Sequence, residues 1–133
     1  MVAACDRLVH RLGRDLEDPE ISCLLRDGDL LRNVAHRSRL RLIFEVPREQ
    51  GGIVWRTIER SEIQLVENVR QDPDYLTTDP SIRSEIAAPV RVEGEVVAVL
   101  DLEFPDRVFE DADVALVRDA AARLGAELAR YRS

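Results

Sequence analysis

The chain has 133 residues, a length that fits one domain with one hydrophobic core. Its composition, 45% hydrophobic and 34% charged, is typical of a globular protein, and its formal net charge of −7 disfavours nucleic acid and anionic membrane surfaces as partners. No apolar run reaches the ~18 residues of a membrane span, and we read no signal peptide at the N-terminus. We therefore expect a cytoplasmic location.

The first third of the chain predicts a helix and a hairpin. Apolar residues recur at steps of three and four and favour an N-terminal helix over residues 1–17, which Asp18-Pro19 ends. Two apolar runs, residues 21–25 and 30–36, then flank Asp27-Gly28. Glycine tolerates positive φ, so this pair favours a tight turn and predicts a β-hairpin.

The middle of the chain is less regular. Residues 39–61 contain Pro47 and Gly51-Gly52 as breaks, and we expect a short helix after the glycines. Residues 63–69 predict a short strand, and residues 71–80 are rich in turn formers and predict a loop.

The last third predicts two strands and a helix. Residues 82–92 and 95–104 flank Glu93-Gly94, a second tight-turn pair, and the continuous apolar run over residues 96–100 favours a central strand covered on both faces. Apolar residues at alternating steps of three and four predict a C-terminal helix over residues 110–131. These elements amount to an α+β domain built around a mainly antiparallel sheet.

One segment resembles a known family. Ile82-Arg-Ser-Glu-Ile-Ala-Ala-Pro-Val90, followed by the Gly94-Glu-Val-Val-Ala-Val-Leu100 strand, is similar to the GAF-domain signature. The resemblance implies that residues 1–133 form a single GAF domain with a central antiparallel sheet of five or six strands. The terminal helices would pack on one face, and an irregular helical roof would cover a pocket on the other. GAF domains bind cyclic nucleotides, haem, bilins, nitrate or amino-acid derivatives, so the fold alone does not choose a ligand.

A catalytic branch of this family reduces free methionine-(R)-sulfoxide, and Asp79 with Ser84-Glu85-Ile86 matches part of its pattern. That chemistry needs thiolates to attack the sulfoxide sulfur and to resolve the intermediate. The chain has two cysteines, Cys5 and Cys23, and both precede the segments that resemble this branch. On these grounds we predict that the domain is not an enzyme.

The ligand and cofactor sites of other GAF domains match this sequence poorly. Cyclic-nucleotide domains resemble this chain at Asn68, Phe109 and Asp113, but the lysine that they need is absent, as is every other lysine. Haem needs an axial ligand and a bilin needs an attachment thiol, whereas His10 and His36 are interpreted as surface residues. We expect neither a cofactor nor a metal.

The strand over residues 82–92 carries two charges that need an explanation. Strict alternation would place Arg83 and Glu85 on one side and Ile82, Ser84 and Ile86 on the other. Either the charged side is exposed, or Arg83 and Glu85 pair with neighbouring residues, or this side lines the pocket that the family resemblance implies. In the second interpretation Arg83 offers a planar guanidinium to an anion such as a carboxylate or nitrate.

Three aromatic residues of the irregular middle, Phe44, Trp55 and Tyr75, are candidates for the pocket wall, although a single Trp is more often a core residue. We therefore predict that the pocket binds a small polar or anionic metabolite. The candidate ligand-binding residues are Arg83, Glu85, Trp55, Tyr75, Phe44 and Asp79.

The predicted function is a sensory or regulatory GAF domain that passes its signal through the terminal helices or to a downstream signalling protein. The alternative is a ligand-free dimerisation or protein-interaction module. In both cases the apolar faces of the terminal helices predict a homodimer.

Overall fold

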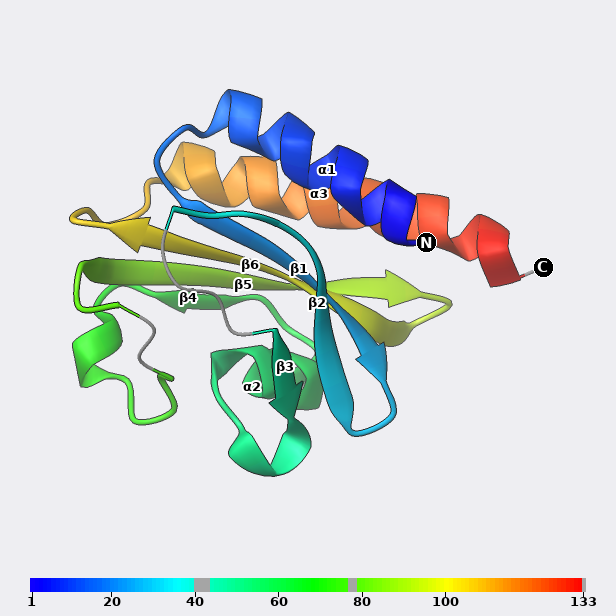
Figure 1. The fold of residues 1–133 in the computed structure, drawn as a ribbon, viewed down its shortest axis with the longest axis horizontal. Helices are drawn as coiled ribbons and strands as arrows, with labels where there is room; N and C mark the ends of the chain where they lie inside the picture. Colours follow the sequence, from blue (N-terminus) through cyan, green and yellow to red (C-terminus); the bar gives the residue numbers. More distant parts are fainter. Residues whose placement is uncertain (40–43, 77–78, 133) are drawn as a thin grey trace.

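The computed structural model describes residues 1–39, 44–76 and 79–132. Within them the chain forms a six-stranded antiparallel sheet with the strand order β3-β2-β1-β6-β5-β4 and three α-helices (Figure 1). This is the predicted α+β class. The elements are α1 (Val2–Asp15), β1 (Glu20–Asp27), β2 (Leu30–Arg37), β3 (Glu45–Pro47), α2 (Ile53–Arg60), β4 (Gln64–Val66), β5 (Ile82–Val92), β6 (Glu95–Pro105) and α3 (Asp111–Ala129).

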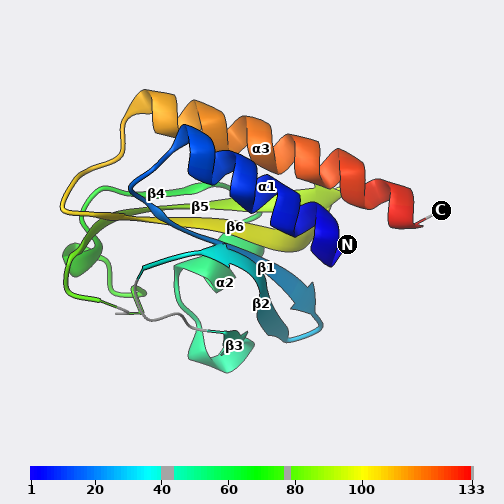
Figure 2. The same ribbon diagram turned by 45° about the horizontal axis from the view of Figure 1, so that its top comes forward.

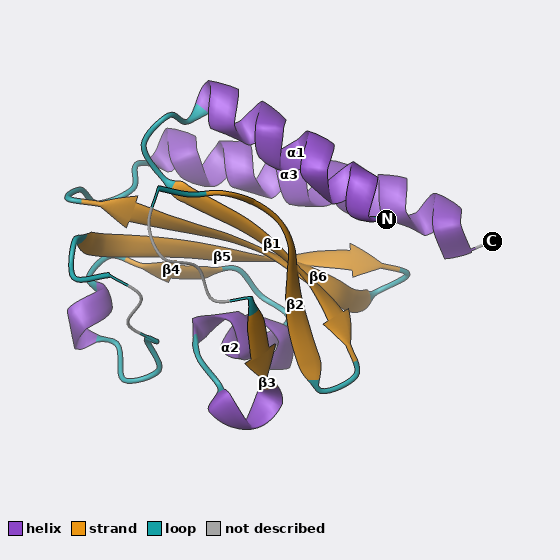
Figure 3. Ribbon diagram, viewed as in Figure 1, coloured by secondary structure: helices purple, strands orange, loops and turns teal. Residues whose placement is uncertain are grey.

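The two faces of the sheet carry different layers. The terminal helices α1 and α3 lie side by side on one face, here called the helix face (Figure 2). The opposite face, here called the roof face, is covered by the roof, which consists of α2 and residues 67–76 (Figure 3). Buried apolar residues fill both spaces. They include Cys5, Leu8, Ile86, Leu100, Leu102 and Leu124 on the helix face, and Leu24, Val54, Trp55, Ala87 and Val99 on the roof face.

The strand turns follow from local sequence. Glu93 and Gly94 have φ values of 54° and 80° and join the paired residues Val92 and Glu95, which confirms the predicted two-residue turn. In the first hairpin the turn lies one position later than predicted, because Asp27 pairs with Leu30 and leaves Gly28 and Asp29 as the loop. Gly28 there has a φ of 59°, so the glycine has the role that the sequence predicted.

The middle of the chain is more regular than predicted. The short helix after the two glycines is confirmed as α2, and the short strand before the loop as β4. The sequence missed β3, which pairs with β2 at the edge of the sheet. None of the helices within the described ranges is long and apolar enough to cross a membrane.

A close contact between α3 and β5 gives the first testable prediction. A Cβ built on Gly125 would lie 2.4 Å from the backbone oxygen of Arg91, whereas one built on Gly13 would meet only the Arg37 side chain. Replacing Gly125 with alanine is expected to destabilise the domain by about 1–3 kcal/mol, because the clash with backbone outweighs the higher helix propensity of alanine. Urea denaturation of Gly125→Ala and of the control Gly13→Ala measures this, and equal stabilities would contradict it.

Candidate functional site

Three carboxylates gather on the roof face of the two longest strands. Glu85 of β5 and Asp101 and Glu103 of β6 each place one oxygen within 4.8 Å of the others. Glu85 is 3% exposed and Asp101 is 9% exposed, while Glu103 is half-buried. We call these three residues the acidic cluster. Carboxylates are rarely buried without a partner of opposite charge, so this cluster is the candidate functional site.

The ladder between β5 and β6 explains how these residues meet. Glu85 lies directly opposite Glu103, and Asp101 lies opposite the next roof-face residue of β5, Ala87. Only Glu85 was among the predicted site residues. The sequence pattern that would have identified the other two acids is the alternation of Asp101-Leu102-Glu103-Phe104. It places two acids on one face of the strand and two apolar residues on the other.

Burial and mutual repulsion shift the titration of the cluster. Loss of solvent raises the pKa of Glu85 well above its usual range, and the negative charges of Asp101 and Glu103 raise it further. Burial also raises the pKa of Asp101, although a hydrogen bond with Glu85 opposes this shift. Two carboxyl groups form such a bond only when one of them carries a proton. Burial and the neighbouring acids therefore favour the protonated form of Glu85.

The cluster has unused bonding capacity. Asp101 Oδ1 is buried and has no hydrogen-bond partner among the described residues. No ion pair joins Glu85 or Asp101 to any basic side chain within the described ranges. Ser22 of β1 lies directly opposite Asp101, and its hydroxyl accepts a 3.0 Å bond from Asn33 Nδ2. The site therefore offers acceptor oxygens to a cation or to a donor.

The roof above the site is fastened by one arginine. Arg56 of α2 donates two 2.8 Å hydrogen bonds to Asp72, one of 3.0 Å to Asp74 and one of 2.9 Å to Gln64. The Arg56 and Asp72 side chains are 14% and 13% exposed. A partly buried bidentate pair of this kind holds its partners in a fixed geometry. Arg56 thus ties residues 72–74 to α2.

The strict alternation predicted for residues 82–86 requires correction. A β-bulge between Ile82 and Ser84 interrupts the alternation, so Ile82 packs in the roof-face core while Ser84 faces the helix face. Arg83 is exposed and lines a surface groove with Arg56 and other roof residues, so the structure does not place it with the acidic cluster.

Two of the predicted aromatic residues have other surroundings. Trp55 is 1% exposed, packs in the roof-face core and donates a 2.8 Å bond from Nε1 to the Val46 carbonyl oxygen. These contacts are those of a core residue, which was the alternative interpretation. Phe44 is 58% exposed and packs edge-on against His36 with ring centroids 5.8 Å apart. Ligand contact by either residue stays a prediction.

The remaining two candidates lie near each other. Tyr75 and Asp79 line a cavity of about 270 Å³ under the end of the roof, together with Val69 and Ile82. Tyr75 packs against the roof-face core, so it belongs to the layer above the acidic cluster. Asp79 accepts a 2.9 Å bond from the Ser81 amide, which gives it a role in the turn that leads into β5.

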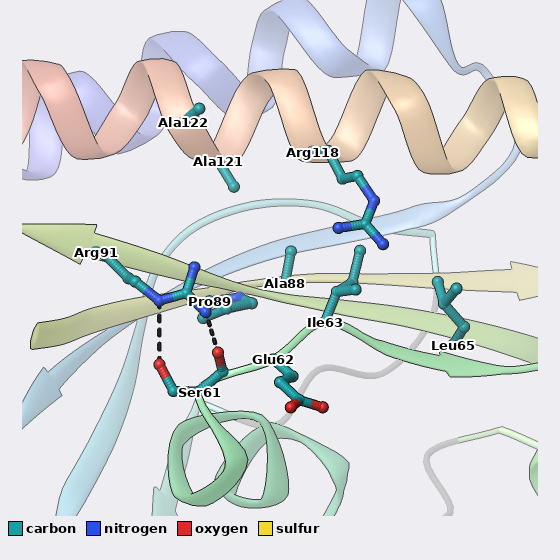
Figure 4. Close-up of a pocket in the computed structure, with 10 residues that line it drawn as sticks. All are labelled: Ser61, Glu62, Ile63, Leu65, Ala88, Pro89, Arg91, Arg118, Ala121 and Ala122. Atoms are coloured by element: carbon teal, nitrogen blue, oxygen red, sulfur yellow. Dashed lines mark hydrogen bonds between the residues drawn. The ribbon is translucent and has the colours of Figure 1, made fainter. Parts of the chain in front are cut away.

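A larger groove lies elsewhere, between α3 and the β4 edge of the sheet, with a volume of about 740 Å³ (Figure 4). Ala88 and Pro89 of β5 line one side, Ala121 of α3 lines the other, and Arg118 extends over the groove from α3. Arg91 is held by Ser61 at the opposite end. The charged residues around this groove are exposed, unlike those of the acidic cluster. It is therefore the weaker candidate for a specific site.

Both cysteines lie on the opposite side of the sheet from the acidic cluster. Cys5 of α1 and Cys23 of β1 are fully buried in the helix-face core. A hydrogen bond between the two thiols lowers the pKa of Cys5 and raises that of Cys23. The sheet therefore separates the thiols from the candidate site.

The six-stranded antiparallel sheet between the terminal helices and the roof defines an α+β domain, and the GAF domain model matches residues 1–128. The chain belongs to the GAF domain family. As a member of that family it is, in general terms, a sensory or regulatory domain. Protein YtsP of Bacillus subtilis is 29% identical over 80 residues, which make up 59% of this chain and 49% of YtsP. The match thus spans about half the length of this curated relative.

Solved structures share the fold at low sequence identity. A type II free methionine-R-sulfoxide reductase from Thermoplasma acidophilum is 20% identical with a TM-score of 0.85, over 93% of this chain and 89% of that one. The free methionine-R-sulfoxide reductase of Neisseria meningitidis in complex with its substrate is 21% identical with a TM-score of 0.85, over 99% and 81%. A putative GAF sensor protein from Burkholderia vietnamiensis is 18% identical with a TM-score of 0.80, over 97% and 84%.

These structures correct one prediction. The sequence predicted that the domain is not an enzyme, and that exclusion is wrong, because free methionine-R-sulfoxide reductases have the same fold as this chain. The prediction was based on the positions of Cys5 and Cys23, which precede the segments that resemble the reductases. The fold itself carries enzymes as well as sensors, so the fold does not exclude catalysis.

Proposed function

We propose that the domain is a sensor whose roofed site binds a small metabolite with a positively charged amino group, in the class of free amino acids and their derivatives. The observation that carries this proposal is the buried acidic cluster, in which Glu85 and Asp101 have no basic partner among the described residues. An ammonium group has three donors and forms strong charge-assisted bonds to carboxylates. Asp101 Oδ1 is a ready acceptor for one of them.

The charge of the site changes the ligand that we expect. The sequence favoured a polar or anionic metabolite because Arg83 was expected to offer its guanidinium to an anion in the pocket. Arg83 is exposed, and Glu85 and Asp101, which have no basic partner among the described residues, disfavour an anion beside them. A neutral or anionic part of the ligand would therefore lie away from the cluster, under the roof.

A thermal-shift screen of the whole domain tests this proposal. Free amino acids, including methionine-R-sulfoxide, are compared with the same compounds after N-acetylation, and with nitrate and divalent metal ions. Saturation at one hundred times the Kd is expected to add about 2.7 kcal/mol, a shift of several degrees, for a compound with a free amino group. Shifts with anions or metal ions alone, or equal shifts before and after N-acetylation, would contradict the proposal.

Catalysis is a second candidate, favoured by the reductases that share the fold. Reduction of a sulfoxide by two thiols yields the sulfide, a disulfide and water. Cys5 and Cys23 lie across the sheet from the acidic cluster, so the two electrons would have to come from an external thiol. Incubation with methionine-R-sulfoxide and dithiothreitol, followed by measurement of methionine, tests this candidate against an enzyme-free control.

The ligand-free dimerisation module is favoured by one surface observation. Exposed apolar side chains gather where the N-terminus of α1 lies beside the end of α3 (Figure 1), and they are Met1, Val2 and Tyr131. Apolar residues that cluster at a surface mark contact sites. A melting temperature that rises with protein concentration, without a shift from any compound, would favour a homodimer formed through the terminal helices.

A further inference from the structure

The groove between α3 and the β4 edge of the sheet, here called the α3 groove, has an apolar lining that comes from three elements (Figure 4). The apolar side chains that the argument uses are Ile63 and Leu65 from the segment that contains β4, Ala88 from β5, and Ala121 and Ala122 from α3. A single exposed leucine is ordinary, but Leu65 is exposed beside other apolar residues. The groove volume of about 740 Å³ lies in the range of small-molecule sites.

The charges around the α3 groove are unbalanced. Arg118 extends over the groove, and it forms neither a hydrogen bond nor an ion pair within the described part of the chain (Figure 4). Arg91 donates a 3.0 Å bond from Nε to the Ser61 hydroxyl, which holds the guanidinium without neutralising it. Glu62 is the one acid among the described residues that line the groove, and it is exposed. Two arginines beside an apolar surface favour an anionic occupant, although the chain as a whole has a net charge of −7.

The space beside α3 fits a slender chain better than it fits a helix or a strand. α3 packs so closely on β5 that a Cβ built on Gly125 would lie 2.4 Å from the backbone oxygen of Arg91. Beyond β5 the sheet continues with β4 alone, one strand spacing of about 4.8 Å away, whereas a helix with its side chains is about 10 Å across. An added strand would pair with the three residues of β4 at its outer edge and would leave the groove empty.

A second apolar groove, near the C-terminal end of α3, has balanced charges. Its volume is about 590 Å³, and its lining contains two arginines, Arg26 and Arg32, together with two acids, Asp27 and Glu95. Arg32 lies 3.7 Å from Asp27 in an ion pair. An anion placed there would meet negative charges as well as positive ones, so the α3 groove is the better site for an anion.

We propose that the α3 groove binds a carboxylic acid with an aliphatic chain of medium length. The carboxylate lies at Arg118, whose guanidinium offers it two parallel donors. The chain lies against Leu65 and Ala88 and extends toward Arg91. Ala88 belongs to the helix-face core, on the opposite side of the sheet from the acidic cluster. The site is therefore independent of the proposed function and takes a ligand of the opposite charge.

Calorimetric titration of the whole domain with hexanoate, octanoate and decanoate, below the concentrations at which they form micelles, tests the site. Affinity is expected to rise about threefold with each added methylene group, somewhat less than complete burial of the group would give. Decyltrimethylammonium carries a chain of the same length as a cation, and it should bind at least about tenfold more weakly than decanoate. Equal affinities for these two head groups, or an affinity that does not grow with chain length, would overturn the proposal.

Arg118→Gln removes the positive charge at the carboxylate and is expected to weaken decanoate binding about tenfold or more. Arg123→Gln is the matched control, because Arg123 lies on the same helix, is exposed and pairs with Asp119. It should bind decanoate as the unchanged chain does. Both arginines are exposed, so both variants should fold. An equal loss in the two variants would indicate a general effect of charge, and no loss in either would place the ligand elsewhere; each result overturns the proposal.

Ala122→Glu tests the groove by filling it. Ala122 lines the groove and is exposed, whereas Ala126, one turn further along α3, is exposed and lies outside the lining. We expect Ala122→Glu to abolish decanoate binding and Ala126→Glu to retain it. Sedimentation velocity on the same variants reports the oligomeric state. If Ala122→Glu dissociates an oligomer and the unchanged chain binds no decanoate, the groove is an interface between copies of the chain and the proposal is wrong.

Discussion

Glu85→Gln is expected to stabilise the domain at neutral and alkaline pH and to flatten the dependence of its stability on pH. The pKa of Glu85 is raised in the folded state by burial and by Asp101. Below the usual pKa of a glutamate the group is protonated in both the folded and the unfolded chain. As the pH rises, the unfolded chain releases the proton first, so the free energy of unfolding falls until the raised pKa has been passed.

Glutamine cannot ionise and still supplies a donor to Asp101, so the variant avoids this loss. We expect a gain of about 1–3 kcal/mol at pH 8, the usual cost of a buried polar group that is incompletely compensated. Urea denaturation between pH 5 and pH 9 measures it. Glu62→Gln is the control, because Glu62 is exposed and its variant should follow the unchanged chain. Parallel pH profiles for Glu85→Gln and the unchanged chain would contradict a raised pKa.

The sequence predicted those parts of the fold that depend on local rules. Glu93-Gly94 fixes its turn because both residues have positive φ, and the last helix shows its apolar spacing directly. β3 was missed because three residues are too few for a periodic pattern, and its pairing with β2 depends on tertiary contacts. Local sequence patterns therefore predict the longer strands and the helices better than the three-residue edge strand β3.

The candidate site was predicted in part, and the reasons differ from residue to residue. Glu85 was found because a charge within an apolar strand is conspicuous. The side of Ile82 was predicted wrongly because a bulge shifts the alternation by one position, which no sequence pattern marks. Arg83 is exposed, which is one of the placements that the sequence left open. The alternation after the apolar run of β6 could have identified Asp101. Its role in the site depends on Glu85, which is distant in the sequence and adjacent in the sheet.

Asp101→Asn is expected to weaken the binding of an amine-bearing ligand about thirtyfold or more, equivalent to about 2 kcal/mol or more. Asp101 is nine-tenths buried and its Oδ1 has no described partner, so the variant would replace a charged acceptor in contact with the ammonium by a neutral amide. Calorimetric titration with the compound found in the thermal-shift screen measures this change. Asp119→Asn on the exposed surface of α3 is the control and should bind as the unchanged chain does.

The same titration reports whether Glu85 loses a proton when the ligand binds. A cation binds best when Glu85 is ionised, so affinity should rise with pH and each binding event should release up to one proton. Titration in buffers with different ionisation enthalpies counts the protons. In Asp101→Asn the release should fall, because loss of the Asp101 charge lowers the pKa of Glu85. A ligand that binds with unchanged affinity between pH 6 and pH 8 and releases no proton would have to lie elsewhere under the roof, away from the acidic cluster.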